Sequence, residues 1–196
     1  MTNIIIGVTG KIGSGKSTAS KYIHEKLSGD NAYFDTCTER VYDNHRLLSC
    51  DELVSDLYSL PHVQHQLHKH FLVKNKVGIK GLKLNINDLD KLAEIFLPFI
   101  VGYLYGLEGH WVVEIPLLFE RKMKYLCYTT INISTYADIR CKRIDERLKD
   151  NFGIIDSKQM SDYDRNQYTD HTVNNNGTPE EMYKKLDDII EGYLNS

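Results

Sequence analysis

The chain has 196 residues, of which 41% are hydrophobic and 26% charged, a composition typical of one compact domain with room for a small lid or insertion. Its 24 basic and 27 acidic side chains give a net charge of −3, which argues against a nucleic-acid partner held by a broad basic face. No apolar run reaches the roughly 18–20 residues of a membrane helix, so we expect no membrane association.

The start of the first strand and the spacing of the cysteines predict a cytoplasmic protein. The first strand begins at Asn3 or Ile4, and we expect no leader segment ahead of it. Four cysteines are widely spaced and form no metal-binding or disulfide pattern, so we expect reduced thiols at Cys37, Cys50, Cys127 and Cys141.

Apolar periodicity predicts strands and helices that alternate along the chain, which is typical of an α/β fold with a parallel sheet. In chain order the sequence predicts the strand Ile4–Thr9, the helix Lys16–Leu27 closed by Gly29, an irregular connection over Asp30–Asn44, the strand Arg46–Cys50, the helix Asp51–Leu60, a helix over 61–72, turns over 74–87, the helix Asp88–Tyr105, the strands Trp111–Ile115 and Leu126–Ile133, the helix Ala137–Lys149, and a last helix that begins in the capping box of Thr178 and Glu181.

The turn after the first strand carries the most informative motif. Residues Gly10–Ser17 read GKIGSGKS and match the phosphate-binding pattern G-x-x-x-x-G-K-[ST], between an apolar strand and an amphipathic helix. Glycines let main-chain N–H groups curl around an anion, and the helix N-terminus attracts the same charge. Lys16 is expected to reach the β- and γ-phosphates of a nucleotide, and the Ser17 hydroxyl to bind Mg²⁺.

Other segments narrow the class of nucleotide-binding protein. A GTPase needs an N-K-x-D segment, and Asn75–Gly78 lacks the aspartate. A transporter ATPase needs an L-S-G-G-Q signature, and Leu27–Asn31 shares only three letters with it at the end of the first helix. A small-molecule kinase is the class that remains.

Several motifs in order resemble the dephospho-coenzyme A kinase family, which phosphorylates the ribose 3′-hydroxyl of dephospho-CoA with ATP. The P-loop is similar to the family's T-G-G-I-G-S-G-K-S-T, and Pro116–Glu120 matches its P-L-L-F-E. The remaining matches are an arginine pair, a Q-x5-[KR] spacing and a closing segment with asparagines: Arg143 and Arg147, Gln159 and Arg165, and Asp170–Gly177.

This resemblance implies a three-layer α/β/α P-loop NTPase fold of one domain, with the core at about 1–60, 106–135 and 166–196, a helical acceptor-binding region at about 61–105 and a lid at about 140–165. It implies ATP and Mg²⁺ as cofactors, and a monomer or small homo-oligomer whose partners are small molecules. The ATP-binding residues would be Lys11, Ile12, Gly13, Ser14, Gly15, Lys16, Ser17, Thr18, Arg143 and Asn175; the catalytic ones Lys16, Asp51 and Arg147; the acceptor-binding ones Asp51, Pro116, Leu117 and Arg165; the metal ligand Ser17.

The sequence departs from the family pattern in the loop and near the acceptor. Lys11 replaces the second loop glycine, and Leu97 replaces a histidine before Pro98. The family's D-A-D aligns with Ser49–Asp51, which makes Asp30–Leu48 an insertion, or alternatively with Asp35–Cys37. The acceptor-site carboxylate is therefore Asp51, with Asp35 as the alternative.

Each assigned side chain also has a structural interpretation. Asp51 is expected to be the general base or a water-mediated metal ligand, or else to cap its helix. Arg147 is expected to close over the γ-phosphate, or else to pair with Asp145 or Asp150. Glu114, at a strand end, orients a metal-bound water or only lies in a turn.

Four histidines lie close together in the sequence and could suggest a metal site, but their helical spacing does not bring all four to one face. His62 and His65 share a helical face, whereas His68 and His70 turn away from them, so a solvated face is expected.

Three functions stay open at this point. The first is dephospho-CoA kinase, which completes coenzyme A. The second is a nucleoside or deoxynucleoside monophosphate kinase of the same fold, and the third is a nucleotide-binding protein without activity.

Overall fold

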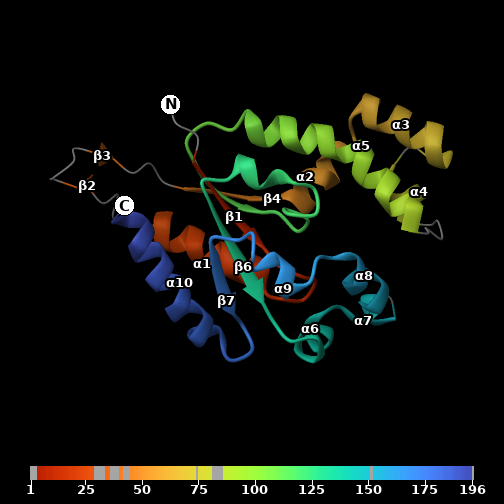
Figure 1. Ribbon diagram of the computed structural model, residues 1–196. Coiled ribbons are helices and arrows are strands. Elements are labelled where there is room, and N and C mark those ends of the chain that lie inside the picture. The colour runs from red at the N-terminus through yellow and green to blue at the C-terminus, as the bar shows by residue number, and fades with distance from the viewer. Residues whose placement is uncertain are drawn as a thin grey trace. The chain divides into compact units, whose positions relative to one another are not determined.

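The computed structural model describes residues 4–28, 34–35, 40–41, 45–73, 75–80, 86–150 and 152–195. The chain divides into two compact units, one of residues 1–48 with 108–196 and the other of residues 49–107. The first unit contains the main sheet, and the second is helical (Figure 1).

Five strands form the main sheet, in the order β4-β5-β1-β6-β7. Strand β1 pairs in parallel with β5 and with β6, and β6 pairs in parallel with β7. Their bounds are Arg46–Ser49 for β4, His110–Glu114 for β5, Ile4–Thr9 for β1, Thr129–Ser134 for β6 and His171–Asn174 for β7. The expected α/β class is confirmed, and the carboxyl ends of β1, β5, β6 and β7 lie along one edge because these strands run the same way.

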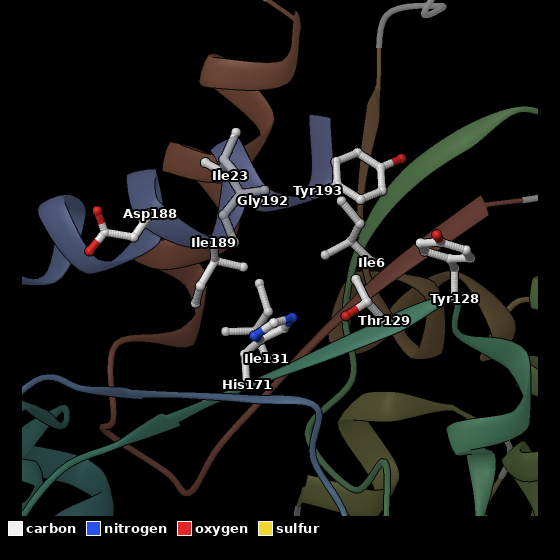
Figure 2. Close-up of a pocket in the computed structure, with 11 residues that line it drawn as sticks. Ile6, Ile23, Tyr128, Thr129, Ile131, His171, Asp188, Ile189, Gly192 and Tyr193 are labelled. Carbon is white, nitrogen blue, oxygen red and sulfur yellow. The ribbon is translucent and has the colours of Figure 1, made fainter. Parts of the chain in front are cut away.

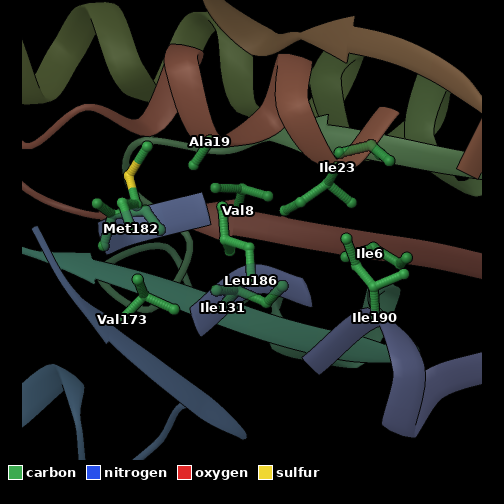
Figure 3. Packing of buried hydrophobic residues seen from close by; sticks show 11 residues of the cluster. Ile6, Val8, Ala19, Ile23, Ile131, Val173, Met182, Leu186 and Ile190 are labelled. Carbon is green, nitrogen blue, oxygen red and sulfur yellow. The ribbon is translucent and has the colours of Figure 1, made fainter. Parts of the chain in front are cut away.

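Helices α1 (Lys16–Ser28) and α10 (Pro179–Leu194) lie against one face of this sheet (Figures 1 and 3). Alternate strand residues point to that face, as the period of two in a strand requires. Side chains at four-residue spacing on α10 meet them. The buried cluster consists of Ile6, Val8, Ala19, Ile23, Val112, Ile131, Ile133, Val173, Met182, Leu186 and Ile190.

The other sheet face packs against the chain that follows β5. A Cβ on Gly7 would lie 2.6 Å from the sulfur of Cys127 and 3.6 Å from Cδ2 of Leu118. The central strand therefore needs glycine here, since the chain returning to β6 through the 3₁₀ turn η1 (Met123–Leu126) passes directly over it.

The start of α10 is confirmed as a capping box. The Thr178 hydroxyl accepts from the Glu181 N–H, the Glu181 carboxylate accepts from the Thr178 N–H, and Pro179 occupies the first turn. These bonds satisfy main-chain donors that a helix N-terminus otherwise leaves without partners.

The single helix expected over Ala137–Lys149 was wrong. The structure has α6 (Ala137–Arg143) and α7 (Glu146–Lys149), separated at Ile144, whose backbone is extended with φ −81° and ψ 157°. Ile144 packs by the phosphate loop, because a Cβ on Gly13 would lie 3.0 Å from its Cγ2. This tertiary contact explains a break that the charged, periodic sequence did not indicate. Helices α8 (Phe152–Lys158) and α9 (Asp162–Arg165) follow.

The second unit consists of α2 (Cys50–Leu57), α3 (Pro61–Phe71), α4 (Lys76–Lys80) and α5 (Ile86–Tyr105). The expectation of turns throughout 74–87 was wrong for α4, where the Asn75 side chain accepts from the Gly78 N–H at 2.8 Å and Ile79 is buried. The buried cluster consists of Leu53, Leu57, Val63, Leu67, Ile79, Leu92, Ile95 and Phe96. The four histidines of α3 are all exposed.

Much of the expected irregular connection, and Gly29, lie outside the described residues. The described parts are two short antiparallel strands, β2 (Phe34–Asp35) and β3 (Arg40–Val41). Asp35, the alternative acceptor-site carboxylate, belongs to β2.

Candidate functional site

The turn between β1 and α1 needs glycine at Gly10, Gly13 and Gly15, all of which have a positive φ. Gly13 and Gly15 have φ values of +74° and +96°, where side chains other than hydrogen are strained. A Cβ on Gly13 would lie 2.5 Å from the Arg140 carbonyl oxygen, and one on Gly15 2.4 Å from Nδ2 of Asn175. The loop is thus closely packed from two sides at the N-terminus of α1, where amide donors and the helix dipole favour an anion.

Lys16 brings an ammonium group to the same turn. Its Nζ donates to the Lys11 carbonyl oxygen at 3.2 Å, and the Ser14 N–H donates to that oxygen at 3.1 Å. Lys16 follows Gly15 directly at the start of α1, and its side chain folds back across the turn. One cation and a set of main-chain donors therefore share one small loop, as phosphate binding requires.

Ser17 and Glu114 join the loop to the neighbouring strand. The Ser17 hydroxyl donates to Oε1 of Glu114 at 3.0 Å, and Glu114 is buried at the end of β5, where it is paired in register with Val8. In the part of the chain that the structure describes, no group of three or more His, Cys, Asp or Glu side chains could hold a metal. Mg²⁺ bound with a nucleotide takes only one or two protein oxygens, so the Ser17–Glu114 pair fits it.

Asn175 supports the loop from the end of β7. Its side-chain Nδ2 donates to the Ser14 carbonyl oxygen at 2.8 Å, and its main-chain carbonyl oxygen accepts from Nη1 of Arg143 at 3.1 Å. The Thr135 hydroxyl also lies 3.0 Å from the Ser14 oxygen. The structure thus brings two predicted ATP-binding residues, Asn175 and Arg143, together beside the loop.

Lys11 and Arg140 share one carboxylate. Lys11 Nζ lies 3.0 Å from Oδ1 of Asp156 on α8, and Arg140 Nη1 bonds to the same oxygen. Burial of Asp156 raises the pKa of its carboxyl, but the hydrogen bonds and charges of Arg140 and Lys11 outweigh it, and the net pKa lies below its ordinary value. Asp156 is therefore ionised at neutral pH.

Ile12 bonds through its main chain to Gln159, just after α8, and to Arg140 on α6. Its N–H donates to Oε1 of Gln159 at 2.7 Å, and its carbonyl accepts from Nη1 of Arg140 at 3.3 Å. The Ile12 amide is therefore engaged by a side chain in this structure.

Arg165, expected to bind the acceptor, is fully buried. Nη2 lies 2.8 Å from Oε1 of Glu120, and Nη1 lies 3.4 Å from Oδ1 of Asp162. The same Glu120 oxygen accepts from the Met160 N–H at 2.8 Å. A guanidinium held by two carboxylates without solvent exposure favours a structural role, because contact with a substrate would break these pairs.

The structure places the other predicted residues along the chain, and none of them takes part in the loop contacts described above. Asp51 is the second residue of α2, is exposed, and belongs to the other unit; Ser49 is the N-cap, so Asp51 does not cap the helix. Pro116 and Leu117 are half-buried after β5, and Thr18 is exposed on α1. Arg147 lies on α7, and its side chain is outside the described set.

Two hollows lie on the first unit. One of about 240 Å³ adjoins the loop and is lined by Ser17, Thr18, Lys21, Tyr22, Glu25 and Tyr183. The other, of about 630 Å³, lies at the amino ends of β6 and β7 beside α10, with Tyr128, His171 and Tyr193 among its mostly apolar walls (Figure 2). None of the walls of the second hollow belongs to the phosphate loop.

Sequence reasoning missed Arg140, Asp156 and Thr135. Arg140 lies three residues before Arg143 on α6, and this spacing places both on neighbouring positions of one helix. Asp156 gave no signal, since a lone carboxylate in a polar segment is common. Its partners, Lys11 and Arg140, lie in distant segments that only the folded chain brings next to α8.

In the described ranges, no helix combines the length and apolarity needed to cross a bilayer.

Comparison with known proteins found relatives that match along nearly the whole length of the chain. A dephospho-CoA kinase of Bartonella quintana is 30% identical over 208 aligned positions, which cover 97% of this chain and 98% of the relative. A dephospho-CoA kinase of Fusobacterium nucleatum is 29% identical, with 97% and 99% covered. The solved dephospho-CoA kinase of Campylobacter jejuni has the same fold, with a TM-score of 0.57, 18% identity and 97% of each chain covered. No family model matches the chain.

Proposed function

The chain belongs to the dephospho-CoA kinase family, and from this we propose that it transfers the terminal phosphate of ATP to the ribose 3′-hydroxyl of dephospho-CoA, which yields coenzyme A. The observation that carries the proposal is the glycine loop at the carboxyl end of β1, with Lys16 and the Ser17–Glu114 pair beside it. In open parallel sheets, ligands bind at this edge.

We propose that the loop and its neighbours hold the triphosphate. The amides that begin α1 and the Lys16 ammonium would neutralise the β- and γ-phosphates, while Arg143 and Asn175 border the nucleotide. Arg147 would add positive charge as phosphate leaves ADP, a contribution on the order of 10³–10⁵ in rate for related transfers. Positioning and charge neutralisation would supply most of the catalysis, since phosphoryl transfer leaves the protein little covalent chemistry to do.

The acceptor hydroxyl would be oriented by Asp51 in the helical unit, with Pro116 and Leu117 beside the acceptor. The hydroxyl oxygen forms a bond to the γ-phosphorus as the bond from that phosphorus to the bridging oxygen breaks. The hydroxyl proton passes to the Asp51 carboxylate, and ADP leaves with the bridging oxygen.

Mg²⁺ is the cation that the loop would hold, through the Ser17 hydroxyl with Glu114 beside it. When bound it neutralises charge on the β- and γ-phosphates. Supporting this, the two side chains present oxygens 3.0 Å apart at the mouth of the loop.

A panel of acceptors with labelled ATP tests the proposal. Labelled phosphate should enter dephospho-CoA, and omission of Mg²⁺ should abolish the transfer. Label in nucleoside monophosphates but not in dephospho-CoA would favour the monophosphate kinase, and ATP binding without any transfer would favour a protein without activity.

Lys16→Met gives the companion test of the loop itself. Loss of the ammonium group should lower turnover by at least 100-fold, because the other loop lysine, Lys11, is held by Asp156. Lys184→Met, which removes an exposed lysine from α10, is the matched control and should leave turnover unchanged. Equal activity of both variants would refute the proposed role of the loop.

We also propose a cytoplasmic location and a monomer or small homo-oligomer. The described cysteines Cys50, Cys127 and Cys141 carry free thiols, which suits a reducing compartment. Fractionation of cells that express a tagged chain tests the location, and light scattering tests the oligomeric state.

A further inference from the structure

Lys11 is the loop residue that distinguishes this chain from the family pattern, and its side chain is largely buried. Only 12% of the side chain is exposed, and Nζ lies 3.0 Å from Oδ1 of Asp156. A long, flexible ammonium side chain is thereby held in one position at the first turn of the loop.

Asp156 fixes a second cation at the same place. Arg140 is 3% exposed and donates to Asp156, to the Thr135 carbonyl oxygen at 2.9 Å and to the Ile12 carbonyl oxygen at 3.3 Å. Its guanidinium also lies 5.4 Å from the ring centre of Phe152, the first residue of α8. One carboxylate of α8 therefore holds both the loop and the helix α6 that packs against it.

The main chain of Lys11 connects this cluster to the proposed catalytic ammonium group. The Lys11 carbonyl oxygen accepts from Lys16 Nζ, so movement of the Lys11 main chain shifts or breaks one contact that holds Lys16. The N–H of the next residue, Ile12, is fixed by Gln159 of the same lid segment.

We propose that Asp156 is a positioning residue for phosphoryl transfer, which acts through Lys11 to hold the first turn of the loop and, with it, the Lys16 ammonium group. This inference rests on the proposed function, and it concerns the ATP side of that reaction. Because the partners of Asp156, Lys11 and Arg140, belong to the same unit as the phosphate loop, its substitution should change the affinity for ATP and leave the KM for the acceptor nearly unchanged.

Asp156→Asn is the first variant for the test. The neutral amide cannot balance two neighbouring cations, and the loop should lose its fixed first turn. We expect the KM for ATP to rise about 10-fold and kcat to fall about 10-fold, with the KM for dephospho-CoA changed less than twofold. Asp156→Glu should restore part of the loss. The control Asp187→Asn removes an ion-paired carboxylate from α10, where it bonds to Lys26 and Tyr22, and should change neither parameter.

A double-mutant cycle with Lys11→Met tests the route through Lys11. If Asp156 acts through Lys11, the double variant should bind ATP no more weakly than the weaker single variant. Effects that multiply would overturn the route, as would an ATP affinity within twofold of the parent chain in Asp156→Asn. Should Asp156→Asn fail to fold by circular dichroism, Lys11→Met alone decides, since it leaves the Arg140–Asp156 pair in place: unchanged ATP affinity then refutes the inference.

Binding of a fluorescent ATP analogue keeps this test separate from the proposed function. The affinity is measured without any acceptor, so a chain inactive toward dephospho-CoA can still show coupling between Lys11 and Asp156. If instead the chain is an active kinase and its ATP affinity is unchanged in both variants, the proposed function stands and the inference is refuted.

Discussion

At the scale of single residues, close packing determines what the phosphate loop tolerates. Gly15 combines a left-handed backbone with a missing Cβ whose place would lie 2.4 Å from Asn175 Nδ2. Gly192 on α10 has open space around its missing Cβ. The two glycines therefore make a matched pair for one substitution.

Gly15→Ala should abolish measurable ATP binding, because both the backbone and the displaced Asn175 disturb the loop. Gly192→Ala should leave ATP binding unchanged and raise the free energy of unfolding by about 0.5–1 kcal/mol, since alanine favours a helix. Titration calorimetry with ATP measures the first effect and urea denaturation the second. Normal ATP affinity in Gly15→Ala would contradict the loop geometry.

A buried histidine should make stability depend on pH. His45 is 2% exposed, its Nε2 lies 3.3 Å from the Tyr193 hydroxyl, and its ring packs 5.0 Å from that of His110. Burial, with smaller effects of His110 and His24, lowers the pKa of His45 to about 4 from the ordinary 6.5.

The folded chain therefore binds this proton more weakly than the unfolded chain. The contribution of His45 to stability is complete above about pH 6.5 and is lost as the pH falls to about 4. The total loss is about 3 kcal/mol, at about 1.4 kcal/mol per pH unit. Urea denaturation at several pH values measures this loss. His45→Gln should flatten the profile between these pH values, whereas His62→Gln, on the exposed face of α3, should not.

At the scale of elements, local sequence explains where some helices begin, and tertiary contacts explain where others end. Helix α10 begins at the capping box that its sequence predicted. Helix α6 ends at Ile144, which packs beside Gly13 of the phosphate loop, although the sequence pattern continues as helix through Lys149. A cap lies within four residues of chain, but the partner of Ile144 is more than a hundred residues away.

Thr178→Ala should lower the free energy of unfolding by about 1 kcal/mol, because the Glu181 N–H loses its acceptor. Thr178→Ser keeps the hydroxyl and should lose only a few tenths of that. Thermal or urea denaturation of the three chains measures the difference. Equal losses in the two variants would show that the hydroxyl does not stabilise α10.

At the scale of the whole molecule, the two units carry separate parts of the proposed reaction. The loop and its described partners, from Lys11 to Asn175, lie in the sheet unit, and the helical unit has a core of its own. Leu67 is fully buried in that second core. A substitution that weakens one core should therefore affect either ATP binding or acceptor binding, but not both.

Leu67→Ala should lower the free energy of unfolding by about 2–5 kcal/mol, through lost burial and the cavity that remains. Its affinity for ATP should stay within twofold of the parent chain, while the KM for dephospho-CoA should rise. Leu186→Ala, at a fully buried position of the sheet unit, is the matched control and should weaken ATP binding as well. Weakened ATP binding in Leu67→Ala alone would contradict this division.

The strand–loop–helix that forms the phosphate site, the parallel α/β class and the capped last helix could all be predicted from the sequence, because each follows from neighbouring residues and their periodicity. The pairing of Arg165 with Glu120, and of Asp156 with Lys11 and Arg140, could not be predicted from the sequence and became visible in the folded chain. Whether a charged side chain faces a ligand or a buried partner depends on segments distant in the chain. Burial then sets the free energy of that charge, and burial is a property of the folded molecule.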